Sequence, residues 1–205
     1  MYNILSTGSQ GNAVIYHKSI MVDCGLPFEM VKPFLSDLQI VLLTHEHGDH
    51  ININTLKKIC FERPSLRVGC CEWMVEYVKD FKKVDVYEIG QLYNYGLFLI
   101  SPVKLYHDVK NCGYRIFKDN HKTFHATDTN HLDGISAKDY DLYCIEHNYN
   151  EDTIFERIEA KEAKGDFAYQ RNSINTHLSE QKARDFIYKN RKDSSIVVRL
   201  HESKI

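Results

Sequence analysis

Three histidines and one aspartate stand within the segment from His45 to His50, which reads His-Glu-His-Gly-Asp-His. Neutral imidazole nitrogens and carboxylate oxygens are the ligands that zinc and similar divalent ions bind in proteins. One catalytic ion usually takes fewer ligands from a single segment, so the surplus favours a site for two metal ions. Because alternate residues of an extended segment point the same way, we predict that His45 and His47 bind one ion while Asp49 and His50 bind a second.

The residues before this segment are expected to position it. Gln39 to Leu43 form a short apolar run with β-branched residues, which is typical of a strand buried on both faces. Gly48 supplies backbone freedom for a sharp turn after the strand. A solvated polar loop is the alternative, but it gives no reason for three histidines and an acid in so short a segment.

The order His-x-His-x-Asp-His resembles the defining motif of the metallo-β-lactamase superfamily, and this sequence matches it without substitution. The resemblance implies an α/β fold of the αββα type, a four-layer sandwich of two mixed sheets flanked by helices. It also implies that two divalent metal ions bind at one edge of the sandwich. Zinc is the expected metal, with manganese as the alternative.

The resemblance predicts three further metal ligands downstream. It implies that His107 completes the ligand set of the first ion, that Asp128 bridges both ions, and that His201 completes the set of the second. Taken by themselves, the residues leave alternatives: a surface histidine beside Asp108, a turn aspartate that caps its own backbone, and a histidine close to a frayed chain end.

Length and composition are typical of one compact domain, and we expect residues 1–205 to form a single metallo-β-lactamase-fold domain. At 205 residues a single core is the default, and a hydrophobic fraction of 43% can supply it. The sequence shows no internal repeat, low-complexity tract or proline-rich linker. An ordinary nucleic-acid-binding insertion would therefore have little room.

The N-terminal residues lack the basic and apolar blocks of a secretory signal, and no run approaches the ~20 apolar residues of a membrane span. We therefore expect a cytoplasmic protein with no membrane partner. The six cysteines show no Cys-x-x-Cys pairing and mostly lie in apolar surroundings. This pattern favours reduced, buried thiols.

Strand-like segments and helical periodicity follow one another in an order that suits two sheets covered by helices. One helix is predicted after His50, and another after Ser179, a candidate N-cap with Glu180 in the first turn. Strands are expected near residues 2–6, 12–16, 20–23, 39–43, 66–70, 84–88, 97–105, 113–118, 122–126, 141–145 and 195–200.

Within the superfamily the sequence is most similar to small phosphodiesterase and nuclease-like members, including the YycJ group, and more distantly to ribonuclease Z. The similar segments are the turn from Gly8 to Asn12, the turn that begins at Asp23, and the segments that begin at Ile145 and Asn175. The first turn either brings backbone N–H groups close to a ligand or is a plain hairpin turn. Departures from the group's pattern at Asn130, Tyr149 and Asn150 affect the expected substrate contacts but not the ligand set.

The resemblance to ribonuclease Z implies that His177 is a non-ligand histidine that acts on the phosphate or the leaving group. Leu178 and Ser179 are expected to begin a helix, so His177 would stand just before free amides that favour an anionic phosphoryl oxygen. The alternative is a histidine that only packs at the helix start. The histidines that receive no role are His17, His121, His125, His131 and His147.

These expectations combine into a metal-dependent hydrolase that cleaves a phosphodiester of single-stranded nucleic acid or of a nucleotide, with a hydroxide held between two ions. Asp49 would orient this nucleophile, and His177 would stabilise the transition state or protonate the leaving oxygen. With 26 basic against 28 acidic residues, the chain lacks the positive excess of a long-duplex binder. The 13 tyrosines either include a base-stacking platform or are ordinary core and rim residues.

Two other functions stay open: a small-molecule hydrolase of the same fold that acts on a thioester or another ester, and a metal-binding module without turnover. A true β-lactamase is disfavoured, because these enzymes commonly place another residue where this chain has Asp128. Glyoxalase II-type enzymes carry a C-terminal glutathione-binding region, for which the sequence after His201 leaves no length. RNA, DNA and nucleotide substrates, endo- and exonucleolytic cleavage, and all oligomeric states remain open at this point.

Overall fold

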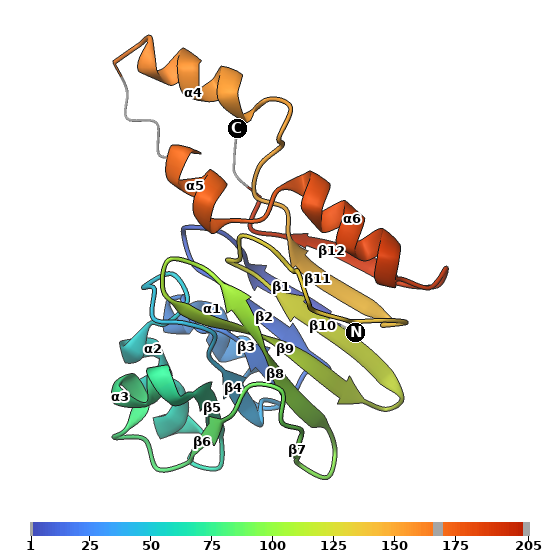
Figure 1. Cartoon of the computed structure of the whole chain (residues 1–205). Coiled ribbons are helices and arrows are strands. Elements are labelled where there is room, and N and C mark those ends of the chain that lie inside the picture. Colours follow the sequence, from blue (N-terminus) through green and yellow to red (C-terminus); the bar gives the residue numbers. More distant parts are fainter. Residues whose placement is uncertain (1, 166–169, 203–205) are drawn as a thin grey trace. The chain divides into compact units, whose positions relative to one another are not determined.

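The computed structural model describes residues 2–165 and 170–202 (Figure 1). The chain divides into two compact units, residues 1–91 and 92–205. Each unit is built around its own six-stranded sheet. The expectation that residues 1–205 act as one domain stays a prediction.

The sheet of the first unit has the strand order β1-β2-β3-β4-β5-β6, so every strand pairs with its neighbour in sequence. The first three strands pair antiparallel, whereas β3 to β6 run parallel to one another. This sheet is therefore mixed. Its strands are β1 (Tyr2–Ser6), β2 (Ala13–Tyr16), β3 (Ile20–Val22), β4 (Ile40–Leu42), β5 (Arg67–Cys71) and β6 (Val84–Tyr87).

Short helical segments connect the parallel strands of the first unit: α1 (Phe28–Val31), the 3₁₀ turn η1 (Lys32–Phe34), α2 (Ile53–Glu62), the 3₁₀ turn η2 (Glu72–Met74) and α3 (Val75–Val78). Helix α2 begins after Asn52, whose side chain accepts a hydrogen bond from the amide of Thr55 and so caps the first turn. Leu56 and Ile59 of α2 are fully buried in one core cluster with Val41 of β4. This packing fixes both ends of the loop that joins β4 to α2.

The sheet of the second unit has the strand order β12-β11-β10-β9-β8-β7. Strands β7 to β10 pair antiparallel, and β10, β11 and β12 run parallel. The carboxyl ends of β10, β11 and β12 consequently meet at one edge of this sheet. Its strands are β7 (Tyr93–Asn94), β8 (Leu99–Tyr106), β9 (Lys110–Lys118), β10 (His121–Ala126), β11 (Leu142–Glu146) and β12 (Ile196–Leu200).

Three helices belong to the second unit: α4 (Ile154–Glu162), α5 (Gln170–Thr176) and α6 (Glu180–Asn190) (Figure 1). Ser179 caps α6, as predicted, by accepting a hydrogen bond from the amide of Lys182. The buried face of α6 includes Phe186, which stacks on Phe124 of β10 with ring centroids 5.5 Å apart. The sheet and α6 thus share one core.

The predicted fold class is confirmed at the level of two mixed sheets with helices. The predicted strands all form, with ends that differ by a few residues, and the short strand β7 was not predicted. Its two residues carry too little pattern to indicate a strand. All six cysteines are free thiols, as expected. Among the described residues, no helix has the length and apolar character needed to cross a membrane.

Candidate metal centre

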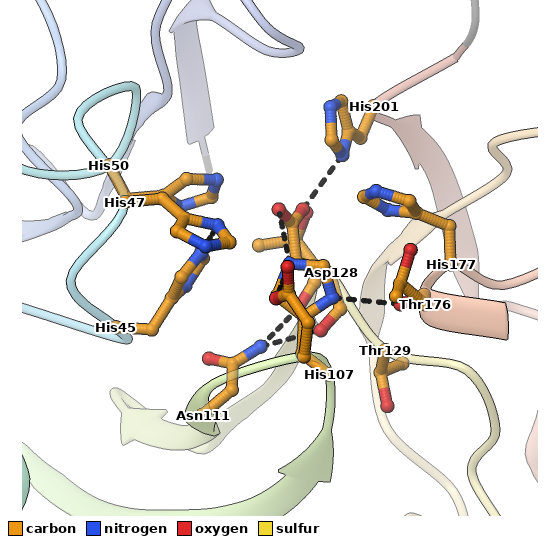
Figure 2. Close-up of polar contacts among 12 residues, drawn as sticks. His45, His47, His50, His107, Asn111, Asp128, Thr129, Thr176, His177 and His201 are labelled. Carbon is orange, nitrogen blue, oxygen red and sulfur yellow. Dashed lines mark hydrogen bonds and ion pairs between the residues drawn. The ribbon is translucent and has the colours of Figure 1, made fainter. Parts of the chain in front are cut away.

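The loop after β4 carries the first predicted ligands (Figure 2). His45 is fully buried, and its Nε2 atom lies 3.2 Å from Nδ1 of His47. Two nitrogen ligands on one tetrahedral zinc ion, each about 2.0–2.1 Å from the metal, would stand about 3.3 Å apart. The spacing of these two ring nitrogens therefore fits a pair of ligands to one ion.

Asp23 holds the buried side of this loop. Its Oδ2 atom lies 2.7 Å from Nδ1 of His50, and its Oδ1 atom accepts hydrogen bonds from the amide and the hydroxyl of Thr44, at 3.0 and 2.9 Å. The Thr44 hydroxyl in turn lies 2.9 Å from Nδ1 of His45. Because a carboxylate only accepts, both rings must place their proton on Nδ1, and each keeps the Nε2 lone pair that a metal ion needs.

Asn12 fixes the end of the same loop. Its backbone amide donates to the carbonyl of Asp49 at 2.7 Å, and its side-chain amide lies 3.3 Å from Oδ2 of Asp49 and 2.9 Å from Nε2 of His50. A Cβ atom on Gly25 would lie only 1.8 Å from the carbonyl oxygen of Asp49, whereas one on Gly48 would meet nothing within 4 Å. The close approach of the loop therefore depends on Gly25, whereas Gly48, which was expected to supply backbone freedom for the turn, does not have a positive φ angle.

The second unit gathers four side chains of the types that can hold a metal ion. One ligand atom from each lies within 4.8 Å of the others, and the residues are Asp128, Glu146, His177 and His201. Figure 2 labels Asp128, His177 and His201. Asp128 and His201 follow β10 and β12, and Glu146 is the last residue of β11. The parallel pairing of these strands therefore brings three residues from distant parts of the sequence to one edge of the sheet.

Asp128 lies between the two predicted histidines of this unit. Its Oδ1 atom is 2.7 Å from Nδ1 of His201, and its Oδ2 atom is 3.7 Å from Nε2 of His107. The carbonyl of Thr176 lies 2.8 Å from Nδ1 of His107, which favours a ring proton there, and Nε2 of His107 also lies 3.0 Å from Oδ1 of Asp108. Asn111 donates to the Asp128 carbonyl at 2.6 Å and so holds the turn in place.

Glu146 is a functional candidate that the sequence analysis did not assign. Its carboxylate is completely buried and accepts hydrogen bonds from Nδ1 of His177 at 2.5 Å and from the amide of Thr129 at 2.9 Å. Oε1 also lies 3.2 Å from Nδ1 of His201. A carboxylate that closes the apolar run Leu142 to Ile145 was the available signal.

The position of His177 differs in part from the prediction. Helix α6 begins at Glu180, and His177 follows the end of α5 instead of directly preceding a helix. The amide of Leu178 is 3.3 Å from Oε2 of Glu146, so it serves this carboxylate and is not available to a phosphoryl oxygen as predicted. The orientation of His177 is therefore fixed by its hydrogen bond to Glu146 and not by a helix start.

The two buried carboxylates determine the charge of the neighbouring rings. Burial alone would lower the pKa of His201, but Asp128 and Glu146 outweigh it and raise this pKa to about 10. Burial also acts to lower the pKa of His177, and the hydrogen bond to Glu146 raises it overall. For His107 burial is the larger effect and lowers the pKa. A site that attracts positive charge and offers carboxylate and imidazole donors fits a divalent cation.

Three residues that contact or belong to these ligand sets have left-handed backbone conformations. The φ angles are 61° at Asp23, 53° at Asp128 and 48° at His201. Such conformations are uncommon outside glycine and gather at functional sites.

The described residues thus place the predicted ligands in two sets, each within one unit. The first set, in residues 1–91, is His45, His47, Asp49 and His50, and the second, in residues 92–205, is His107, Asp128 and His201. Asp128 and His201 form one cluster with Glu146 and His177. Sequence reasoning missed Asp23, Asn12 and Glu146 as residues that hold these sets.

Comparisons with known proteins agree with these observations. Residues 18–154, more than half of the chain, match the family described as the Beta-lactamase superfamily domain. Two curated relatives, both the Exodeoxyribonuclease WalJ from Streptococcus pneumoniae strains D39 and R6, are 30% identical over 171 residues. The match covers 73% of this chain and 62% of each relative, so the chain spans less than two thirds of their length.

Solved structures support the same fold. The metallo-β-lactamase fold protein YhfI from Bacillus subtilis has a TM-score of 0.76 at 17% identity, with 100% of this chain and 86% of that chain covered. The short form of human tRNase Z has a TM-score of 0.71 at 14% identity, with 99% and 92% covered. A diphosphatase of the PhnP family has a TM-score of 0.67 at 14% identity, with 98% and 86% covered. The chain is a member of the β-lactamase superfamily and has the metallo-β-lactamase fold.

Proposed function

We propose that this protein is a metal-dependent phosphodiesterase or nuclease that acts on single-stranded nucleic acid or on a nucleotide. The observation that carries the proposal is the buried cluster in which Glu146 orients His177 beside Asp128 and His201. It provides imidazole and carboxylate donors for a metal and, separately, an oriented histidine for proton transfer. The names of relatives and structural neighbours, an exodeoxyribonuclease, a tRNase and a diphosphatase, point to the same class of substrate.

We further propose that the ligand pattern of the superfamily applies here with two divalent ions, zinc or manganese. His45, His47 and His107 would bind one ion, Asp49, His50 and His201 would bind the other, and Asp128 would bridge them. When bound, the ions would lower the pKa of a water molecule and neutralise charge on the phosphate. The contacts of Asp23 and of the Thr176 carbonyl support this assignment, because they favour a ring proton on Nδ1 of His45, His50 and His107, and a metal ion would then bind at Nε2.

Two residues would act on the reacting groups. Asp49, whose side chain is 25% exposed, would orient the attacking water. His177 donates its Nδ1 proton to Glu146, so its Nε2 atom is the one that can carry a proton to the leaving oxygen.

The charge of the chain supports a short or single-stranded substrate. A formal net charge of −2 gives no broad attraction for the dense phosphates of a long duplex. A strand end or a nucleotide needs only a few local contacts. We therefore place single-stranded DNA and RNA first among the substrates to test.

The proposal is tested with purified protein loaded with zinc or with manganese. End-labelled single-stranded DNA, single-stranded RNA, a chromogenic phosphodiester and a thioester are each incubated with the wild type, His177→Ala and His121→Ala. Cleavage of a phosphodiester that falls with His177→Ala and persists in His121→Ala supports the proposal. His121 lies in the same unit, on β10, outside the metal-binding cluster. Thioester hydrolysis without phosphodiester cleavage, or two bound ions without any turnover, would overturn it.

A further inference from the structure

Tyr106 and His131 form a stacked aromatic pair in the second unit. Their ring centroids lie 4.2 Å apart with an interplanar angle of 22°. Tyr106 is 38% exposed, and the His131 side chain is 34% exposed. The ammonium group of Lys104 lies 5.1 Å from the Tyr106 ring centroid. The pair is therefore a partly open aromatic surface that already contacts a cation.

Backbone hydrogen bonds hold this pair in place. The amide of Asn130 donates to the Tyr106 carbonyl at 2.6 Å, and the Tyr106 amide donates to the Thr129 hydroxyl at 3.0 Å. The same hydroxyl donates to the carbonyl of His131 at 2.9 Å. The two rings thus come from segments that are fixed to one another, and a ligand that stacks on them would not have to order them first.

The pair is also adjacent in sequence and space to two proposed metal ligands. Tyr106 directly precedes His107, and Thr129, which is bonded to both aromatic residues, directly follows Asp128. A base stacked on the pair would consequently be held by segments that continue directly into two proposed ligands.

Lysines surround the pair. Lys110 faces Tyr106 in the register of β8 and β9, and the Nζ atom of Lys182 lies 3.3 Å from the carbonyl of Asn130. Two exposed acids are close: Asp108, and Asp133, whose carboxylate lies 3.6 Å from Nδ1 of His131. Together with Lys104, three lysines and two carboxylates surround the pair. The local charge is therefore positive, which favours an anionic ligand with an aromatic part.

We propose that Tyr106 and His131, with Lys104 and Lys182, bind a nucleobase and a neighbouring phosphate of a single strand. This inference rests on the proposed function and names the part of the substrate that the site recognises. Stacking on an aromatic side chain tolerates any base, and lysines contact phosphates without regard to sequence. The pair therefore selects for a base-bearing single strand instead of for a particular sequence. It also gives His131 a role that the sequence analysis did not assign.

The test compares two strands that differ only in their bases. One is a fluorescent phosphorothioate single strand of about eight nucleotides, a length within the range that such surfaces bind, and the other is its abasic counterpart. Binding to the metal-loaded protein is followed by fluorescence anisotropy. We expect Tyr106→Ala to weaken binding of the base-bearing strand by about 5- to 100-fold and to leave binding of the abasic strand little changed. Tyr106→Phe should bind like the wild type, because the ring is retained.

Further variants separate stacking from charge and from folding. Lys104→Ala should weaken binding of the base-bearing and the abasic strand by the same factor. It should also reduce the slope of log K against log salt concentration by about 0.7, the value for one phosphate contact on a single strand. Tyr188→Ala is the matched control, since Tyr188 is 86% exposed and lies on α6 of the same unit. Circular dichroism and thermal unfolding verify that Tyr106→Ala is folded, and His131→Ala provides a second test of the pair.

Two results would overturn the inference while leaving the proposed function intact: cleavage by a wild type that binds both strands equally, or a Tyr106→Ala variant that matches the wild type on both. A different result would support the binding surface and refute the proposed nuclease function. This result is a wild type that prefers the base-bearing strand, loses this preference in Tyr106→Ala and cleaves no phosphodiester.

Discussion

The Nδ1 atom of His50 lies 2.7 Å from Oδ2 of Asp23, and both side chains are buried. The same carboxylate reaches His45 through the hydroxyl of Thr44. One acid that takes no direct part in the proposed ligand set therefore fixes the tautomers of two proposed ligands. We therefore expect the affinity of the proposed ligands for metal to depend on a residue outside the His-x-His-x-Asp-His motif.

Asp23→Asn tests this dependence. The amide keeps the size of the side chain but can donate to either ring, so the preferred tautomers are lost. We expect zinc affinity to fall by about 10- to 100-fold, as is typical when such a partner is changed. Competition with a chromophoric chelator measures the affinity, and Asp37→Asn, at an exposed position of the same unit, is the control. Equal zinc affinities of the Asp23→Asn variant and the wild type would contradict the role of Asp23.

Metal content distinguishes the ligands from the oriented histidine. We expect Asp128→Ala and His47→Ala each to lower the number of bound ions, because each removes a proposed ligand. His177→Ala should retain the ions and slow cleavage, because its Nδ1 atom is held by Glu146. Elemental analysis by mass spectrometry measures occupancy alongside turnover. His177 belongs to the group of donors within 4.8 Å, so loss of an ion in His177→Ala would reassign it as a ligand.

Gly25→Ala should destabilise the first unit. The new Cβ atom would lie 1.8 Å from the carbonyl oxygen of Asp49, and either the turn or the metal-binding loop must move. Overpacking of this kind typically costs about 1–3 kcal/mol. Gly48→Ala, which meets nothing within 4 Å, should change the free energy of unfolding much less. Urea denaturation of both variants checks the difference, and similar midpoints for the two would refute the contact argument.

The carboxylate of Asp141 should contribute to the stability of the fold in a way that depends on pH. Burial acts to raise its pKa, but the hydrogen bonds from the Lys192 ammonium at 2.6 Å and the Lys122 amide at 2.8 Å hold this pKa below its ordinary value. The contribution is therefore present above the ordinary aspartate pKa of about 3.9 and is lost as the pH falls below it. Because the pair is partly exposed, Asp141→Asn should cost at most about 1 kcal/mol at neutral pH.

The pH series for this pair compares the midpoints of urea unfolding of the wild type and Asp141→Asn from neutral to acidic conditions. The two should converge as the carboxylate of the wild type takes up its proton. A difference that stays constant down to the most acidic condition would show that the pair contributes through packing and not through charge.

The cysteines should react slowly in the folded protein. Burial raises the pKa of Cys24 far above its ordinary range and that of Cys70 to about 12, and it raises the pKa of the half-buried Cys60 to about 11. The thiolate is the reactive form, so alkylation of these thiols at neutral pH should be slow in the folded protein and slowest at Cys24. Mass spectrometry after a timed iodoacetamide reaction should find Cys60 modified before Cys24, and rapid native labelling of Cys24 would contradict its burial.

The sequence predicts the strands well where periodicity is local, and it places the proposed ligands of the second unit correctly relative to them. His107, Asp128 and His201 are each found at the end of a strand that the apolar pattern predicts. Asp23 and Glu146 were missed because their roles arise from hydrogen bonds across neighbouring strands and loops, which no spacing in the sequence encodes. His177 was placed at a helix start because Ser179 is a good N-cap, but the partner of His177 is a carboxylate from β11.

The positive φ angles of Asp23, Asp128 and His201 have a consequence for the evolution of thermal resistance. A left-handed backbone costs a side-chain-bearing residue roughly 1–2 kcal/mol relative to glycine. Variants selected only for survival at high temperature should therefore accumulate glycine or other relieving changes at these positions and lose the ability to bind metal as they gain heat tolerance. Retention of all three residues under such a selection would show that their side-chain contacts stabilise the folded chain by more free energy than the left-handed backbone costs.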